Sequence, residues 1–322
     1  MAVTEKILSQ QTQTDSLTDM VANHYDNRIL MELAGEIQFD PILSKAEVDG
    51  ALKAYRKVTG QEKIPDVVYL PMAGPLRHVP SLLDSGVENA VAVDLSKGSL
   101  DAGMERYGND IENNVEIHNS DIRDIEEFVP EEGFDLAISM GNSFGDVTNW
   151  EGHLSILQAF ADSLAENGVF VFDYVGNRYN PPVGEIIKTE WSDVHVNSQT
   201  GIQTPVKDVR SRKFVPFPGQ ADIPYEEQVG VLRFTCEVTN VQTGEILVPL
   251  HGYEKLVIPD AILEQQFAAV GLRLVKLGPI TENSAYHRQR VAEKDDLGMM
   301  GKPDNLYVAV KDRLVENERR DL

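Results

Sequence analysis

The sequence predicts an α/β fold built on a mostly parallel sheet. Short, continuous apolar runs bounded by turn residues are typical of buried parallel strands, and they recur at 66–72, 89–95, 114–120, 134–140 and 168–174. Between the last two runs lies a helical pattern over 150–164, followed by Asn167-Gly168, a frequent helix stop. Because strands and helices alternate, we expect βαβ units and a parallel sheet.

The N-terminal part of the chain is predicted to be helical. Apolar residues follow helical spacing at Ile29, Leu30, Leu33 and Ile37. Asp40-Pro41 interrupts this pattern, and Ser44 followed by Glu47 indicates a capping box, which predicts a helix over 45–58. We therefore expect an N-terminal helical cap over residues 1–60.

The alternation of strands and helices stops after Tyr174. Residues 176–256 are richer in β-branched residues, turns and prolines, and the segment VTNVQTGEI indicates a hairpin loop between two apolar runs. These features predict an antiparallel β insert, which would serve as a lid or as an interface between copies of the chain. A helix that ends at Gly271, a strand, and a last strand over 305–311 then follow.

Together these elements predict a Rossmann-like, seven-stranded, mostly parallel sheet with one antiparallel strand and helices on both faces. Its core would span residues 61–175 and be completed by 257–322.

The composition excludes several kinds of partner. The chain has 29 basic and 52 acidic residues and a formal net charge of -23, so its surface repels nucleic acid and anionic membranes. Cys236 is the only cysteine, which excludes an internal disulfide or a cysteine-based zinc site, and no metal site is expected. The sequence shows neither a signal-peptide pattern nor a long apolar run, and we expect a cytoplasmic protein.

The first strand–helix turn and the end of the second strand predict a nucleotide-type pocket. In open α/β sheets, ligands bind beyond the carboxyl ends of the strands. An acid about 20 residues after the first turn can accept both hydroxyls of a ribose, and Asp94 follows Ala73 at about this interval. Pro71 and Pro75 stand where a dinucleotide-binding turn has glycines, and the lack of donors argues against a NAD-dependent dehydrogenase. S-adenosylmethionine has no phosphate and tolerates such a turn.

Two further strand ends carry polar residues. Asp121 follows the third strand, where it could accept the adenine amino group, and Ile122 could cover the ring; the alternative for Asp121 is a helix N-cap. The fourth strand runs into SMGNSFGDV, in which Asn142 and Ser143 could orient a substrate, although such residues are also ordinary in turns.

In these segments, together with the GVFVFDYVGN strand, the chain resembles the class I S-adenosylmethionine-dependent methyltransferases, especially small-molecule N-methyltransferases of the glycine and amino-sugar types. The resemblance implies a transferase that methylates an amine or hydroxyl of a small molecule, with Tyr25 of HYDNR packed over the cofactor. Its departures are Tyr69, where the family has an acid, and the scarcity of glycines in the first turn. The expected cofactor-binding residues are Tyr25, Ala73, Gly74, Arg77, Asp94, Leu95, Asp121, Ile122, Met140 and Gly141.

The insert offers the catalytic candidates. A protonated amine must lose its proton before it can accept a methyl group, and LHGYEKL supplies His251 as the base, with Tyr253 beside it; Tyr174 is a candidate for substrate binding. His251 could instead pair within the sheet of the insert. Residues Arg210, Arg212 and Lys213 are expected at a solvated strand edge, or else to bind a substrate carboxylate, and Tyr286 and His287 in a solvated loop or near the site.

Two other kinds of function stay open at this point. A degenerate member could bind the cofactor for a non-methylating reaction or for sensing, and a non-catalytic assembly partner would bind no cofactor.

Overall fold

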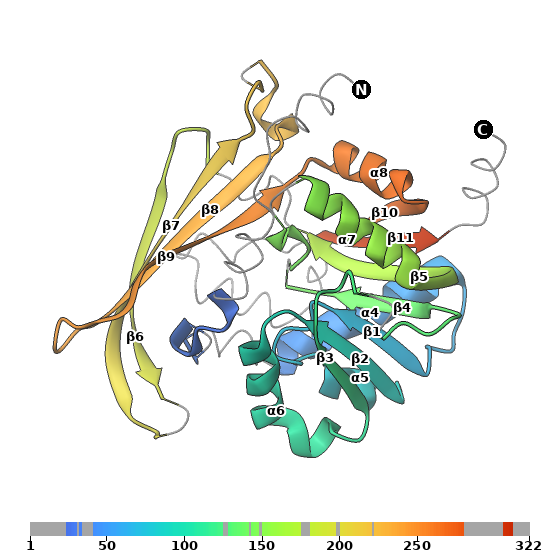
Figure 1. The fold of residues 1–322 in the computed structure, drawn as a ribbon, viewed down its shortest axis with the longest axis horizontal. Helices are drawn as coiled ribbons and strands as arrows, with labels where there is room; N and C mark the ends of the chain where they lie inside the picture. The colour runs from blue at the N-terminus through green and yellow to red at the C-terminus, as the bar shows by residue number, and fades with distance from the viewer. Residues whose placement is uncertain are drawn as a thin grey trace. The chain divides into compact units, whose positions relative to one another are not determined.

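The computed structural model describes residues 24–30, 32–33, 41–124, 128–141, 143–147, 150–174, 181–197, 200–220, 222–279 and 305–311. The chain divides into two compact units (Figure 1). The core unit comprises Phe39–Phe144, His153–Val175 and Asp260–Leu322, and the insert unit comprises Met1–Gln38, Gly145–Gly152 and Gly176–Pro259.

The core unit contains the seven-stranded sheet that the sequence predicts, with the strand order β10-β11-β5-β4-β1-β2-β3. The pairs between β1 and β2, β2 and β3, β1 and β4, and β4 and β5 are parallel, whereas β11 is antiparallel to both of its neighbours. The strands are β1 (Val67–Pro71), β2 (Asn89–Asp94), β3 (Val115–Asn119), β4 (Phe134–Ser139), β5 (Leu164–Tyr174), β10 (Leu272–Pro279) and β11 (Asn305–Lys311). The predicted fold class is thereby confirmed.

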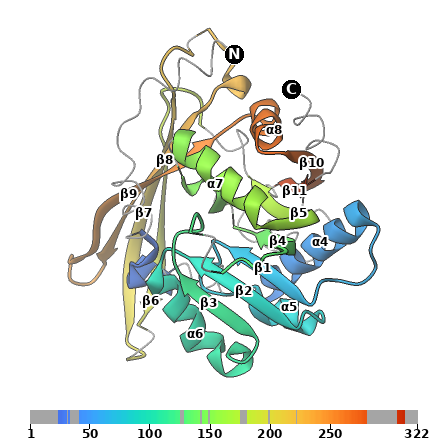
Figure 2. The same ribbon diagram turned by 45° about the vertical axis from the view of Figure 1, so that its right-hand side comes forward.

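Helices cover both faces of this sheet (Figure 2). The alternation of side chains along β5 separates the two faces. Val169 and Val171 share an apolar cluster with residues of α4 (Pro41–Thr59), α5 (Val79–Asp84) and α6 (Lys97–Ile111). Phe170 stacks on Phe160 of α7 (Trp150–Ser163) at 4.2 Å, and Phe172 stacks on Phe267 of α8 (Asp260–Ala269) at 5.3 Å.

Helix α4 starts earlier than the sequence predicts. Its first residue is Pro41, and proline is favoured at a first helical position because its missing N–H has no partner to lose there. Ser44 and Glu47 therefore lie inside the helix, buried, and the predicted capping box is wrong.

The insert unit contains a four-stranded antiparallel sheet in the sequential order β6-β7-β8-β9, as the sequence predicts. The strands are β6 (Ile187–Val196), β7 (Gln203–Pro216), β8 (Gly230–Asn240) and β9 (Ile246–Val257), and a short 3-10 helix η4 (Tyr225–Glu227) precedes β8. The predicted hairpin closes between β8 and β9, where Asn240 N–H donates to Glu245 O at 2.8 Å.

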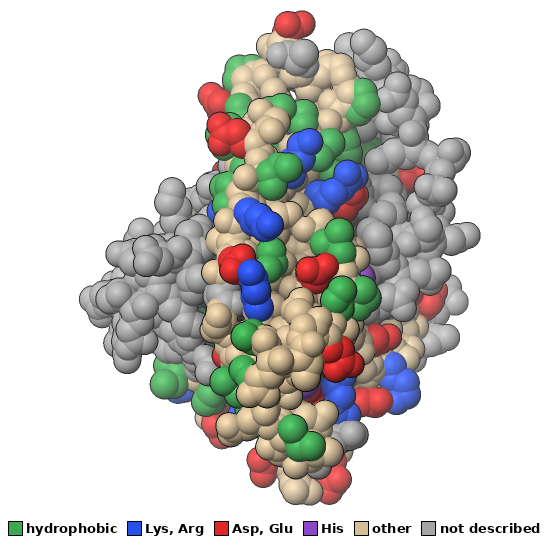
Figure 3. All heavy atoms as spheres, turned by 90° about the vertical axis from the view of Figure 1, so that its left-hand side faces the viewer, with side chains coloured by type: hydrophobic (Ala, Val, Ile, Leu, Met, Phe, Trp, Pro, Cys, Tyr) green, Lys and Arg blue, Asp and Glu red, His purple; other side chains and the backbone are tan. Residues whose placement is uncertain are grey.

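The two faces of the antiparallel sheet differ. On one face, Leu30 packs with Val206, Cys236 and Val238, together with Ile29 and Leu33, whereas Ile37 is outside the described residues. The opposite face, which we call the outer face, mixes charged and apolar side chains (Figure 3). It includes the ion pairs Lys207–Glu190 and Arg233–Glu254 and the exposed Val194.

No helix in the described part of the chain is long and apolar enough to cross a membrane.

Candidate functional site

The turn after β1 and the end of β2 are joined by hydrogen bonds. Ala73 N–H donates to Val93 O at 3.0 Å, and Gly74 N–H donates to Asp94 Oδ2 at 2.7 Å. The other carboxylate oxygen of Asp94 accepts the N–H of Ser96 at 2.8 Å. The structure thus places the Asp94 carboxylate against the first turn, as expected for parallel strands whose carboxyl ends share an edge.

This turn has an unusual backbone. Met72, Gly74 and Leu76 have φ angles of 56°, 55° and 56°, which are uncommon for residues other than glycine. Helix α6 approaches the turn so closely that a Cβ atom on Gly103 would lie 2.5 Å from Pro75 O. Only glycine fits at position 103 without a shift of the backbone, and the sequence analysis missed this residue.

Arg77 lies in a buried ion-pair network. Its guanidinium pairs with Glu47 and donates to Ser44 Oγ at 3.3 Å, while His78 Nε2 lies 2.8 Å from Glu47 Oε2. Burial raises the pKa of Glu47, but the charge of Arg77 and the hydrogen bond from His78 outweigh it and lower the pKa to about 2. The Nη2 atom of Arg77 lies 3.7 Å from the position of a Cβ on Gly141, so the guanidinium reaches the turn after β4.

The turn after β4 is fixed from β5. Gly141, with a φ of 88°, donates its N–H to Oδ2 of the buried Asp173 at 3.1 Å. A short 3-10 helix, η2 (Ser143–Asp146), follows. Ser143 Oγ donates weakly to the carbonyl of the buried Met140 at 3.4 Å. Tyr174, at the end of β5, is also buried, among aromatic side chains.

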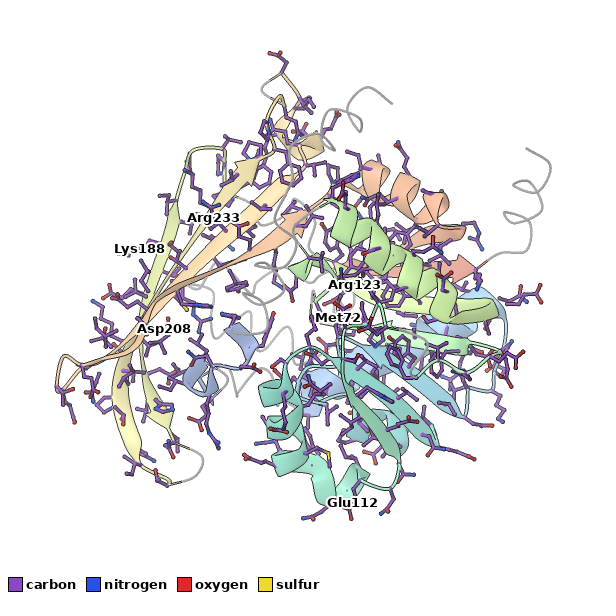
Figure 4. The ribbon with its side chains drawn as sticks, in the orientation of Figure 1. Met72, Glu112, Arg123, Lys188, Asp208 and Arg233 are labelled. Carbon is purple, nitrogen blue, oxygen red and sulfur yellow. The ribbon has the colours of Figure 1, made fainter. Side chains whose placement is uncertain are left out.

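The turn after β3 pairs an acid with a base. Arg123 donates to Asp121 Oδ1 from its backbone N–H at 2.9 Å and from Nε at 2.8 Å. Burial raises the pKa of Asp121, but the hydrogen bonds and charge of Arg123 outweigh it and lower the pKa. Ile122 is buried. Arg123, which the sequence analysis missed, and Met72 both follow strands at the carboxyl edge of the sheet (Figure 4).

The side chain of Tyr69, a position at which the resemblance stated above implies an acid, belongs to the core. It stacks on Phe134 at 4.9 Å and lies 5.9 Å from the ring of Phe128. Burial, together with the charge of Asp121, raises the pKa of its hydroxyl, so the side chain stays neutral.

The remaining candidates lie in the insert unit, in what we call the polar cluster. Tyr25 donates its hydroxyl to Asp146 Oδ2 at 3.1 Å, and Lys255 Nζ donates to Asp146 Oδ1 at 2.5 Å. Burial raises the pKa of Asp146, and the opposing effects of Lys255 and Tyr25 are too small to cancel it. Burial also raises the pKa of the neighbouring Tyr253.

Two histidines complete the polar cluster. The rings of His24 and His251 are stacked, with centroids 5.1 Å apart and planes inclined by 7°. The ring of Tyr253 lies 4.0 Å from that of His24 and stacks on Phe234 at 4.8 Å. The structure therefore brings the three candidates Tyr25, His251 and Tyr253 together.

The prediction that the basic residues of β7 lie at a solvated strand edge is wrong in part. Arg212 is 7% exposed, and Arg210 pairs at 2.7 Å with Asp208, which is 1% exposed. Strand alternation places these three side chains on the same face as Cys236, whereas Lys213 points the other way and is exposed. Figure 4 labels Asp208 of this face and Arg233 of the outer face.

Leu95 is 37% exposed beside Asp94. Asn142, Tyr286 and His287 lie outside the described residues.

Comparison with known proteins identifies the fold. No protein-family model and no curated protein matches this chain, but solved structures do. The CcbJ methyltransferase from Streptomyces caelestis is 16% identical, with a TM-score of 0.60 over 92% of this chain and 98% of that chain. A S-adenosylmethionine-dependent methyltransferase from Clostridium acetobutylicum is 14% identical, with a TM-score of 0.57 over 83% of this chain and 92% of that chain.

A third similar structure is CalS10, an amino pentose methyltransferase from Micromonospora echinaspora, which is 13% identical, with a TM-score of 0.54 over 83% of this chain and 91% of that chain. The fold is therefore that of S-adenosylmethionine-dependent methyltransferases, which confirms the structural side of the predicted resemblance.

Proposed function

We propose that the protein transfers a methyl group from S-adenosylmethionine to an amine or hydroxyl of a small molecule. The observation that carries this proposal is the contact between Asp94 and the first turn in a sheet with methyltransferase topology. A carboxylate at this strand end is suited to accept the hydroxyls of a ribose. CalS10, whose fold is similar, was solved with S-adenosylmethionine bound.

The residues of the core unit fit the parts of this cofactor. Asp94 and Leu95 would hold the ribose, and Ile122 would cover the adenine, with Asp121 accepting its amino group in exchange for Arg123. Arg77, oriented by Glu47 and close to Gly141, would bind the carboxylate of the amino-acid tail, because a guanidinium makes charge-assisted hydrogen bonds to carboxylates. Ala73, Gly74, Met140 and Gly141 would line the same edge.

The polar cluster supplies the candidates for acceptor chemistry. When bound, S-adenosylmethionine supplies an electrophilic methyl group on a sulfonium sulfur, which an acceptor lone pair attacks in line. An amine must first give up a proton, and His251 Nε2, buried and without a hydrogen-bond partner among the described residues, would take it. Tyr25 would pack over the cofactor, and Tyr253, Asn142, Ser143 and Tyr174 would orient the acceptor.

Titration calorimetry with S-adenosylmethionine and S-adenosylhomocysteine tests the cofactor. We expect micromolar binding by the wild-type chain and an affinity about tenfold or more weaker for Asp94→Ala, because two hydroxyls lose a charged acceptor. Asp101→Ala, which removes an exposed acid of α6 paired with Lys97, is the matched control and should bind as the wild type does. Equal affinities for the two variants would place the pocket elsewhere.

A second candidate is cofactor binding without methyl transfer, for another reaction or for sensing. Tyr69 in the place of an acid and the Asp121–Arg123 pair favour it, since both depart from an open cofactor site. The two functions differ in turnover: a sensor would bind S-adenosylmethionine but would methylate none of a panel of amines and alcohols.

A further inference from the structure

His24 is a residue that the proposed chemistry does not use, although it touches the proposed base. Its ring lies parallel to that of His251, with centroids 5.1 Å apart, and on Tyr253 at 4.0 Å. It also meets the ring of Tyr25 edge-on, at 5.1 Å and 81°. The ring of His24 thus contacts the rings of three of the side chains that would serve the acceptor.

The environment of His24 keeps its ring uncharged. Burial, followed by the charges of His251, Lys255 and Arg210, lowers the pKa of His24 from 6.5 to about 3. Asp146 of the polar cluster pairs with Lys255, and Asp208, on the same sheet face as His251, pairs with Arg210, so each carboxylate already has a cationic partner. His24 is therefore the neutral form of the imidazole near neutral pH.

The orientation of the His251 ring decides where its Nε2 atom points. A general base is normally oriented by a hydrogen bond from a third group. Among the described residues, the Nε2 atom of His251 has no hydrogen-bond partner, nor does Nδ1 of His24, although both atoms are buried. The parallel ring of His24 is an aromatic contact of His251, and such a contact restrains the plane of the ring.

We propose that His24 is a positioning residue: its neutral ring holds His251 in the orientation in which Nε2 receives the acceptor proton, and its face stabilises the imidazolium that results. An aromatic face attracts a cation that lies over it. This inference rests on the proposed function only for the identity of the base; the stacking itself needs no cofactor.

Two substitutions of His24 distinguish the effect of its aromatic face from the effect of its ring nitrogens. His24→Phe keeps a flat aromatic face, whereas His24→Leu keeps a similar apolar bulk without one. NMR titration of the His251 ring in the chain without cofactor, with His251→Gln to identify its resonance, should show a pKa about half a pH unit lower in His24→Leu than in His24→Phe. Identical pKa values in the two variants would overturn the proposal.

Kinetics provide the second readout. If the chain methylates an acceptor, His24→Leu should lower kcat about tenfold through misorientation of the base, with little change in KM, and should move the acid limb of the kcat profile to lower pH. His24→Phe should keep the wild-type profile. A loss in His24→Phe as large as that in His251→Gln would overturn the positioning role, because it would make His24 itself the base.

The two proposals fail in different ways. Absence of methylation together with the expected NMR difference would refute the proposed function and leave the stacked pair standing. Methylation of an acceptor together with equal His251 pKa values in His24→Leu and His24→Phe would support the proposed function and refute the positioning role of His24.

Discussion

The turns of the parallel sheet and the polar cluster of the insert unit hold their polar side chains by different means. At the turns, backbone N–H groups and ion pairs satisfy the carboxylates: Gly74 donates to Asp94, Gly141 to Asp173, and Arg77 pairs with Glu47. In the polar cluster, side chains from distant segments meet one another, and nitrogens of His24 and His251 stay without hydrogen bonds among the described residues. A fully bonded site is suited to hold one ligand rigidly, whereas open nitrogens are suited to exchange protons.

The largest loss of stability should come from Glu47→Ala, which removes the carboxylate that pairs with Arg77. The substitution leaves the Arg77 charge buried without its carboxylate, and breaking a buried pair in this way costs about 3–5 kcal/mol. Chemical denaturation of the variant beside the wild type measures the loss. Glu112→Ala, which removes an exposed acid at the end of α6 (Figure 4), should stay within about 0.5 kcal/mol of the wild type.

The same pair predicts a pH dependence. Folding lowers the pKa of Glu47 from 4.5 to about 2, so its contribution is complete above pH 4.5 and is lost as the pH falls towards 2. Glu47→Gln should therefore flatten the acid limb of the stability curve. An unchanged limb would mean that Glu47 is not held by Arg77 and His78 in the folded state.

A smaller effect is expected from Gly103→Ala. The added methyl would meet the backbone of Pro75 at 2.5 Å, and such overpacking costs about 1–3 kcal/mol. Gly108→Ala, in the same helix, would meet only the flexible end of Met104 at 3.4 Å, and should be neutral or stabilising by up to about 1 kcal/mol. Calorimetric unfolding of both variants checks the contrast, and equal stabilities would show that α6 does not fix the first turn.

The smallest effect should come from the outer face of the antiparallel sheet. Glu254→Gln breaks the exposed pair with Arg233, and exposed pairs are worth about 0.2–1 kcal/mol. The difference from the wild type should shrink further in 1 M salt, at which the Debye length is about 3 Å. A loss above about 2 kcal/mol that persists in high salt would show that this face is buried in solution.

The number of strands, their mostly parallel direction and the place of Asp94 could be predicted because they depend on local patterns. The strands are recognisable in the sequence as apolar runs, and the interval between Ala73 and Asp94 is that of one βαβ unit. The partner of Arg77 could not be predicted in this way. Glu47 stands 30 positions away from Arg77. The three-residue spacing between Ser44 and Glu47 occurs in a capping box and also inside a helix, so this spacing does not distinguish the two arrangements.

The stacking of His24 on His251 was beyond sequence reasoning for a similar reason. It depends on the register that places His251 opposite Cys236 and on a contact between segments far apart in the chain. The burial of Arg212 depends likewise on which face of β7 is covered, and alternation alone does not say which. The pairing of Arg123 could have been predicted, because a basic side chain two residues after Asp121 can fold back onto its carboxylate.

Cys236 gives the insert a chemical reporter of its own. It is the only thiol in the chain and is 3% exposed, packed against Leu30, and burial raises its pKa. A thiol-specific reagent can therefore react only when this face of the antiparallel sheet opens. The labelling rate under native conditions therefore reports the opening of the antiparallel sheet at Cys236. The parallel sheet has no cysteine and does not contribute to this rate.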